Sequence, residues 1–203
     1  MTIYDISYCQ PAGTVAKLAN AKADGVIIRN GYMNKTDDNF TMHMSAAIKS
    51  FSTKMIGSYT YIMADNTDQA GVEAINTIRR LRPYKDNINM PIYLDMEHKK
   101  YCDPYKVEEN TALLLLECDY IQKAGYIPGI YTNQSFISCY ILLDTIRNKF
   151  PRLSLWLADY RSNPFNPSMP VDIWQTGTHM VNTLKVDINK CFVDFRSRNK
   201  FFK

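Results

Sequence analysis

Two carboxylates stand two residues apart at the end of an apolar stretch. The stretch reads MPIYLDME, so that Asp95 and Glu97 follow a run of strand-forming residues. Alternate residues of a strand face the same side, which places Tyr93 with both carboxylates and leaves Leu94 and Met96 on the opposite side. Carboxyl groups whose Cα atoms lie roughly 6–7 Å apart can differ in environment, so that one holds a proton while the other is ionised.

This pairing suits the hydrolysis of a glycosidic bond. A protonated carboxyl donates its proton to the leaving oxygen, while a carboxylate stabilises or attacks the carbon that becomes positively charged. The spacing alone does not separate the retaining from the inverting geometry, because the two differ by only a few Å. The alternative without catalysis is that both acids cap helices or pair with nearby arginine and lysine side chains.

Two further acids, Asp5 and Asp187, occupy similar positions. Each occurs late in a short strand-like stretch, in IYDIS and in KVDIN. In a closed barrel the first and last strands are neighbours, so these two acids would meet Asp95 and Glu97 at one mouth. Four converging carboxyl groups are hard to explain by stability, because like charges repel and burying them costs free energy.

An alternation of short strands and longer helices would have to position these acids. The strand-like stretches are rich in Ile, Val, Tyr and Trp, and helices are expected mainly between the first six. This pattern predicts an α/β fold, a modified β/α barrel of eight strands with fewer helices in its C-terminal part. An open, doubly wound sheet is the structural alternative, although no strand is followed by a nucleotide-binding glycine motif. The expected strands are 2–7, 25–30, 55–62, 90–97, 127–132, 153–160, 171–177 and 185–190, and the expected helices are 14–23, 39–51, 67–81, 107–125 and 135–150.

The composition is that of a soluble globular domain. Of 203 residues, 46% are hydrophobic and 22% are charged, so we expect a single domain over residues 1–203. The net charge of +4 is scattered, which argues against nucleic acid as a partner and is compatible with an anionic polymer. The most apolar run, 112–121, is too short for membrane insertion. The oligomeric state stays open.

Cysteine and histidine usage argues against other chemistries. The five cysteines are widely spaced without a CxxC pair, which indicates a reducing compartment rather than a disulfide framework or a zinc site. His98 alternates away from the acids and no HxxxH or HExxH motif occurs, so we expect no metal and no cofactor. Neither Cys9 nor Cys102 belongs to a recognisable constellation with histidine and asparagine, which disfavours a cysteine nucleophile.

The ordered motifs of the chain resemble those of the family 25 glycoside hydrolases, the lysozyme-type muramidases common among phage endolysins and bacterial wall enzymes. They cover nearly the whole chain in the family's order, and the D-x-E of the fourth motif anchors the set. The motifs are YDISYCQ (4–10), GVIIRNGY (25–32), GSYTYI (57–62), IYLDMEHK (92–99), GYIPGIYTN (125–133), LWLADY (155–160), IWQTG (173–177) and VDIN (186–189).

The resemblance implies a peptidoglycan hydrolase that cleaves the β-1,4 bond between N-acetylmuramic acid and N-acetylglucosamine. Glu97 would be the general acid/base. Asp95 would stabilise the transition state, either by direct attack or by orienting the acetamido group of the substrate. Asp5 and Asp187 match two further acids of the family's pocket. No metal or cofactor is implied.

The resemblance also suggests which side chains bind the sugars. Aromatic residues at strand ends would form the platform, a glutamine would hydrogen-bond substrate or buried backbone, and an arginine would pair with an acid or contact substrate. Departures at Cys9, Thr60 and Thr176 leave the four acids intact but concern the sugar subsites. The expected substrate-binding residues are Tyr61, Tyr131, Tyr160, Trp174, Gln175 and Arg29.

The sequence also predicts where the protein is made and where it acts. The N-terminus lacks the basic and apolar segments of a signal peptide, so we expect synthesis in the cytoplasm and action on the bacterial wall after holin-type release. No repeat-type wall-binding module follows the barrel motifs, so no separate wall-binding domain is expected. A catalytically inactive glycan-binding protein on the same barrel is the alternative function, because a fold does not fix an activity. If the protein is an enzyme, a chitin-type glycan is an alternative substrate.

Overall fold

The computed structural model describes residues 1–161 and 169–198. The strands are β1 (Thr2–Ile6), β2 (Gly25–Tyr32), β3 (Lys35–Thr36), β4 (Met55–Tyr61), β5 (Ile92–Asp95), β6 (Pro128–Asn133), β7 (Ser154–Ala158), β8 (Ile173–Val181) and β9 (Leu184–Cys191). The α-helices are α1 (Thr14–Asn20), α2 (Phe40–Ser50), α3 (Thr67–Leu81), α4 (Val107–Lys123), α5 (Gln134–Cys139), α6 (Leu143–Lys149) and α7 (Phe195–Arg198). Short 3₁₀ helices are η1 (Arg82–Asn87), η2 (Lys99–Tyr101) and η3 (Pro104–Lys106).

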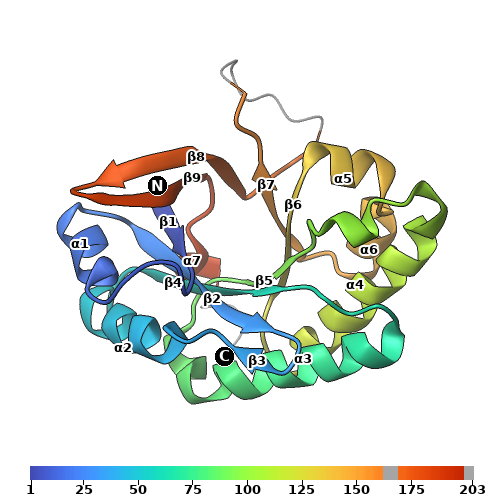
Figure 1. Ribbon diagram of the computed structural model, residues 1–203, viewed down its shortest axis with the longest axis horizontal. Coiled ribbons are helices and arrows are strands. Elements are labelled where there is room, and N and C mark those ends of the chain that lie inside the picture. Colours follow the sequence, from blue (N-terminus) through green and yellow to red (C-terminus); the bar gives the residue numbers. More distant parts are fainter. Residues whose placement is uncertain (162–168, 199–203) are drawn as a thin grey trace.

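All strands except β3 close into one eight-stranded barrel (Figure 1). The six pairings from β1 through β8 are parallel, whereas β9 runs antiparallel to both β8 and β1. β3 only extends β2 as a two-residue antiparallel hairpin. The predicted α/β barrel is therefore confirmed, and the alternative of an open sheet is excluded by the closing pairs of β1 with β2 and β9.

The two faces of β5 are used as the alternation predicts. Tyr93 points into the barrel, where it packs with Tyr131 and Trp156 in a buried cluster. Leu94 and Met96 belong instead to the cluster between the strands and the outer helices. Beyond the strand's end the chain stays extended, because the Met96 N–H donates to the Tyr131 carbonyl over 3.2 Å. Residue 97 consequently continues the inward-facing set.

One helix was predicted to be continuous, and this prediction is wrong. The stretch 135–150 forms two helices, α5 and α6, with a break at residues 140–142. Helix α4 satisfies the backbone groups that the break exposes. The Asn110 amide donates to the Tyr140 carbonyl over 3.0 Å, and the Leu142 N–H donates to the Thr111 hydroxyl over 2.9 Å. Because these partners replace the intrahelical bonds, the chain can turn here without losing hydrogen bonds.

A buried carboxyl on α4 has no structural partner. Glu117 is fully buried, and among the described residues neither of its carboxyl oxygens has a hydrogen-bond partner. Burial, with a smaller contribution from the charge of Glu73, raises its pKa well above the ordinary value. A carboxyl with a raised pKa destabilises the folded state increasingly as the pH rises above its value in the unfolded chain.

We therefore expect Glu117→Leu to raise the free energy of unfolding at pH 8 by about 1–3 kcal/mol, because an apolar side chain of similar volume removes the unsatisfied group. Urea unfolding at pH 8 and at pH 4 checks this, and the gain should be smaller at pH 4. Glu109→Leu, at an exposed position of the same helix, is the matched control. A less stable Glu117→Leu protein would show that the carboxyl is stabilised in the fold.

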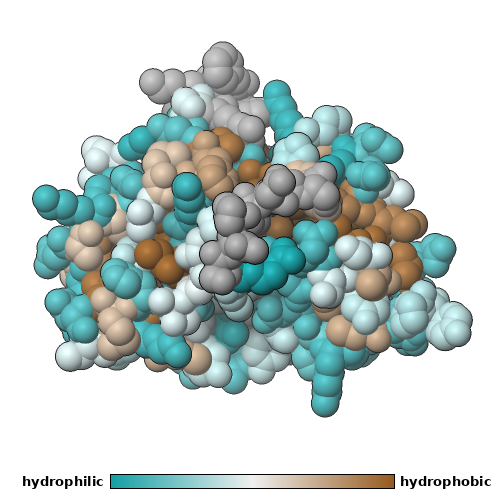
Figure 2. Space-filling model, turned by 90° about the horizontal axis from the view of Figure 1, so that it is seen from above, coloured by the Kyte–Doolittle hydropathy of each residue, from teal (hydrophilic) through white to brown (hydrophobic). Residues whose placement is uncertain are grey.

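One face of the molecule carries both hydrophilic and hydrophobic residues. Figure 2 shows separate hydrophobic areas set among hydrophilic residues on the face seen from above. Among the residues that the structure describes, none of the helices combines the length and the apolar character needed to cross a membrane.

Candidate active site

The barrel brings the four predicted acids to one end. Asp95 is the last residue of β5, and in the sheet it lies beside Tyr61 of β4 and Tyr131 of β6. Asp5 of β1 is paired directly with Asp187 of β9. Because β9 runs antiparallel, its early residues lie at the same end as the late residues of β1. The convergence expected from barrel closure thus occurs, through an antiparallel pair that the sequence pattern did not predict.

The acids differ in exposure. Asp95 and Asp5 are buried, with 4% and 5% of their surface exposed. Asp187 is half-buried and Glu97 is exposed at the mouth. Asp95 and Glu97 therefore have the two unlike environments that acid/base chemistry requires. Asp95 is shielded from solvent, and Glu97 is open to substrate.

Burial sets the proton affinities of the inner acids. The pKa of Asp95 is raised well above its usual value, first by burial and then by the charges of Glu97 and Asp5. Its Oδ1 atom is buried and has no hydrogen-bond partner among the described residues. Burial and the charge of Asp187 raise the pKa of Asp5 to about 7. These groups titrate as a coupled cluster and retain protons at a pH where free carboxyls have lost them.

The outer acids are perturbed in the same direction. The pKa of Glu97 is raised by desolvation and by the charge of Asp187. The pKa of Asp187 is raised by desolvation, which the charge of Lys185 partly offsets. In the free protein, a proton shared by Asp95 and Glu97 resides mainly on Asp95, because Asp95 is buried and Glu97 is exposed.

Two side-chain amides hold Asp5 in place. Its Oδ2 atom accepts hydrogen bonds from Gln175 over 3.0 Å and from Asn189 over 2.8 Å. Asn189 in turn accepts a 2.7 Å bond from the indole N–H of Trp156 inside the barrel. The sequence pattern indicated Gln175 but not Asn189. Its position two residues after Asp187, on the same face of the strand, is the signal that could have found it.

Gln175 also connects two predicted aromatic residues to the acids. Its Oε1 atom accepts hydrogen bonds from the hydroxyls of Tyr131 and Tyr160. Tyr131 is buried, whereas Tyr160 is 63% exposed and reaches the surface from the connection after β7. The chain of contacts from Tyr160 to Gln175 to Asp5 places an exposed ring beside the buried acids, where a sugar could stack.

Two cavities flank the pair on β5. One, of about 580 Å³, is lined by Glu97 together with Phe136, Asp159 and Tyr160. The other, of about 410 Å³, is lined by Tyr61, which lies beside Asp95 in the sheet, and by Tyr8, Arg29 and His98. Glu97 thus opens onto one cavity with aromatic walls, and a second such cavity lies at Tyr61, the neighbour of Asp95 in the sheet.

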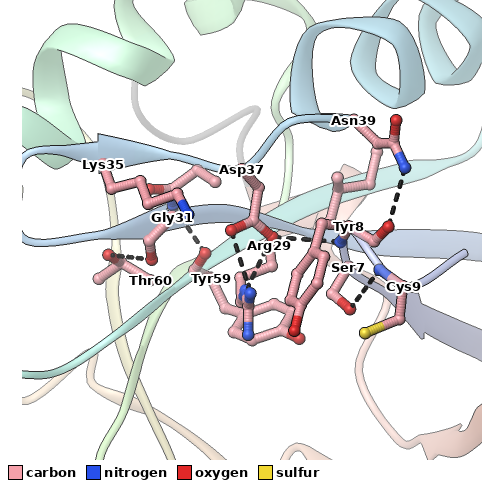
Figure 3. Close-up of polar contacts among 12 residues, drawn as sticks. Ser7, Tyr8, Cys9, Arg29, Gly31, Lys35, Asp37, Asn39, Tyr59 and Thr60 are labelled. Atoms are coloured by element: carbon pink, nitrogen blue, oxygen red, sulfur yellow. Dashed lines mark hydrogen bonds and ion pairs between the residues drawn. The ribbon is translucent and has the colours of Figure 1, made fainter.

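Arg29 pairs with an acid that the sequence analysis did not consider. Its guanidinium donates from Nε and Nη2 to the Asp37 carboxylate over 2.8 and 3.1 Å (Figure 3). Among the described residues, Asp37 and not one of the four predicted acids forms the ion pair with Arg29. The guanidinium also lies 4.7 Å from the ring centre of Tyr8. Asp37 was missed because it lies in a turn, where no periodic pattern indicates which way a side chain points.

Trp174 lies apart from the acids. It precedes the inward-facing Gln175 on β8, so it faces the opposite side of the strand. Its indole N–H donates to the Asp159 carbonyl over 2.7 Å, at the connection that carries Tyr160. Of the predicted binding residues, Tyr61, Tyr131, Tyr160 and Gln175 surround the acids, whereas Trp174 contacts the backbone that supports them.

The donor set does not suggest a metal centre. Within residues 1–161 and 169–198, no group of three or more His, Cys, Asp and Glu side chains is arranged to hold a metal ion. All five cysteines lie in this range as free thiols, two of them buried.

Comparison with known proteins places the chain in a family. The family model described as glycosyl hydrolases family 25 matches residues 4–182, and the chain belongs to this family. The predicted resemblance is confirmed. A search of curated proteins gives no significant match.

Solved structures share the barrel. A family 25 glycosyl hydrolase from Bacillus anthracis has a TM-score of 0.79 at 18% identity, covering 100% of this chain and 94% of that one. The catalytic domain of endolysin ply40 from bacteriophage P40 of Listeria monocytogenes has a TM-score of 0.76 at 23% identity, covering 98% and 97%. The modular autolysin LytC from Streptococcus pneumoniae, solved with a synthetic peptidoglycan ligand, has a TM-score of 0.77 at 22% identity. The alignment covers 93% of this chain but only 46% of LytC, so this chain spans about half its length.

Proposed function

We propose that this protein is an N-acetylmuramidase that hydrolyses the β-1,4 bond between N-acetylmuramic acid and N-acetylglucosamine in bacterial peptidoglycan. The observation that carries the proposal is the buried Asp95 beside the exposed Glu97, between two aromatic-lined cavities of a family 25 barrel. We propose that residues 1–203 act as one catalytic domain, which reaches the wall from the cytoplasm after holin-type release.

Glu97 is the general acid and base of the proposed reaction. It lines the larger cavity, which receives the leaving sugar, and it donates a proton to the glycosidic oxygen. Water then adds to the anomeric carbon and gives a proton back to the Glu97 carboxylate, which restores the starting state. The leaving sugar therefore lies toward Tyr160, and the sugar that bears the new reducing end lies toward Tyr61.

Asp95 stabilises the positive charge that develops at the anomeric carbon. In the free protein its burial favours the neutral form, and its Oδ1 atom lacks a donor. A substrate N–H or O–H that donates to Oδ1 favours the carboxylate, which leaves the shared proton to Glu97. Substrate binding thus switches the pair into the reactive state. Direct attack by Asp95 and orientation of the acetamido group both remain compatible with this geometry.

The test is the chemical identity of the new chain ends. Purified peptidoglycan is incubated with the protein, and the fragments are reduced with borohydride before acid hydrolysis and sugar analysis. We expect reduced muramic acid, because the cleaved bond lies on the reducing side of that sugar. Reduced glucosamine would contradict a muramidase. Protein that sediments with the wall but releases no fragments would indicate an inactive glycan-binding barrel.

A further inference from the structure

Asp37 joins three separate segments beside the candidate active site. It lies in the turn between β3 and α2 and is 5% exposed. Its carboxylate accepts both bonds from Arg29 of β2 and a third, of 3.2 Å, from the backbone N–H of Tyr8 after β1 (Figure 3). We call Asp37, Arg29 and Tyr8 the Asp37 clamp. A carboxylate that receives three bonds while buried fixes the relative positions of its donors.

The clamp holds an aromatic ring at the rim of a cavity. Tyr8 is 49% exposed, so packing alone does not fix its position. Its backbone is held on both sides, since the N–H donates to Asp37 and the carbonyl accepts a 2.8 Å bond from the Asn39 amide (Figure 3). The Arg29 guanidinium stacks on the ring at 4.7 Å. Tyr8 and Tyr61 thereby become two aromatic walls of the 410 Å³ cavity.

The clamp also neutralises a cation close to the acids. The positive charge of Arg29 lowers the pKa of Asp95, although burial and the charge of Glu97 raise it by more. The ionisable groups that interact with Arg29 are Asp37, Tyr8 and Tyr59, and its charge also reaches Tyr61. The bidentate pair with Asp37 supplies the compensating negative charge. Without that charge, Arg29 would favour the ionised form of Asp95 more strongly.

We propose that Asp37 is a positioning residue, which holds Tyr8 as a wall for the sugar units on the Asp95 side of the cleaved bond and neutralises the charge of Arg29. The inference rests on the proposed function, because it assumes that a glycan crosses the acids. A tyrosine ring held at a fixed angle stacks on a sugar at low entropic cost. The clamp therefore acts on glycan affinity through Tyr8 and on acid/base chemistry through Arg29.

The test compares Asp37→Asn with Asp86→Asn, an exposed aspartate of η1 that undergoes the same charge change away from the cavity lined by Tyr8 and Tyr61. Steady-state kinetics are measured on peptidoglycan glycan fragments of increasing length. For Asp37→Asn we expect KM to rise about tenfold on long fragments and less on the shortest cleavable ones, because a misplaced aromatic wall loses one stacked sugar. Tyr8→Ala should reproduce this rise, and Asp86→Asn should leave the kinetics unchanged.

The pH profile separates positioning from a merely structural role. For Asp37→Asn, the acidic limb of kcat/KM should shift to lower pH by roughly half a unit, because the uncompensated Arg29 charge favours the Asp95 carboxylate. Tyr8→Ala keeps the ion pair and should keep the wild-type limb. Asp37→Glu keeps the negative charge beside Arg29 and should keep the acidic limb of kcat/KM at its wild-type position. A profile that does not move in Asp37→Asn, or a KM rise equal at all fragment lengths, overturns the proposal.

Binding without hydrolysis keeps the two proposals distinguishable. Calorimetry measures the affinity of a purified glycan tetrasaccharide-peptide for Glu97→Gln and for Glu97→Gln combined with Asp37→Asn. If the wild type binds but does not hydrolyse, the muramidase proposal fails while an affinity loss of about tenfold in the double variant still supports the clamp. Equal affinities of the two proteins, or no binding by either, overturn it.

Discussion

Replacing Glu97 by glutamine is expected to lower kcat on peptidoglycan by about 10²–10⁴-fold, the usual contribution of a general acid. The amide has nearly the shape of the carboxyl. Glu97 is exposed and makes no hydrogen bond among the described residues that holds the fold together, so KM and the melting temperature should change little. The loss arises because the glycosidic oxygen of a natural glycan is a poor leaving group until it is protonated.

An activated substrate shows whether the lost group is the acid. A β-glycoside with a strongly acidic phenol leaves without a proton, so Glu97→Gln should retain far more activity on it than on the natural glycan. With this substrate the alkaline limb of the pH profile of Glu97→Gln should also disappear, because the variant has no acid at residue 97 that could lose a proton. Glu109→Gln, an exposed glutamate on α4, is the matched control. Equal losses on both substrates would assign Glu97 another role.

Replacing Asp5 by asparagine is expected to stabilise the protein at alkaline pH. The pKa of Asp5 is raised to about 7 in the fold, whereas an aspartate in an unfolded chain titrates near 3.9. Below pH 4 both states hold the proton, and the shift costs nothing. As the pH rises toward 7 the unfolded chain releases its proton first, so the folded state loses up to about 4 kcal/mol of stability.

Asparagine does not titrate, and its carbonyl oxygen can accept the same bonds from Gln175 and Asn189. Thermal unfolding of Asp5→Asn at pH 8 should therefore occur on the order of 10 °C above the wild type, with little difference at pH 4. Asp38→Asn, an exposed aspartate, should show no such dependence. A destabilised Asp5→Asn protein at pH 8 would mean that the ionised carboxylate is favoured by the fold. The stabilised variant should be a poorer catalyst, as expected for a strained active site.

Much of the fold follows from local rules. The alternation of YLDME assigned the inward and outward faces of β5, because a strand has only two sides and the apolar residues identified the helix side. Barrel closure then brought Asp5 and Asp187 together. The break between α5 and α6 was not predictable, because it depends on side chains of α4 that lie near in space but far along the chain.

The contacts that support the site were harder to predict from the sequence. Gln175 was indicated by its neighbour Trp174, yet its link from two tyrosines to Asp5 appears only when β1, β6 and β8 are assembled. The partner of Arg29 was open because arginine reaches far and several acids lay within range. Asp37 became that partner through a turn whose direction depends on β3, a strand of two residues that carries no periodic signal.

The antiparallel closure of the barrel has a consequence for the timing of activity during synthesis. Asp5 leaves the ribosome long before its partner Asp187 and its support Asn189, which lie on β9. Until β9 emerges, β1 has an open edge and the cluster of acids is incomplete. A nascent chain interrupted before β9 would therefore lack both Asp187 and Asn189, the two groups that complete the surroundings of Asp5.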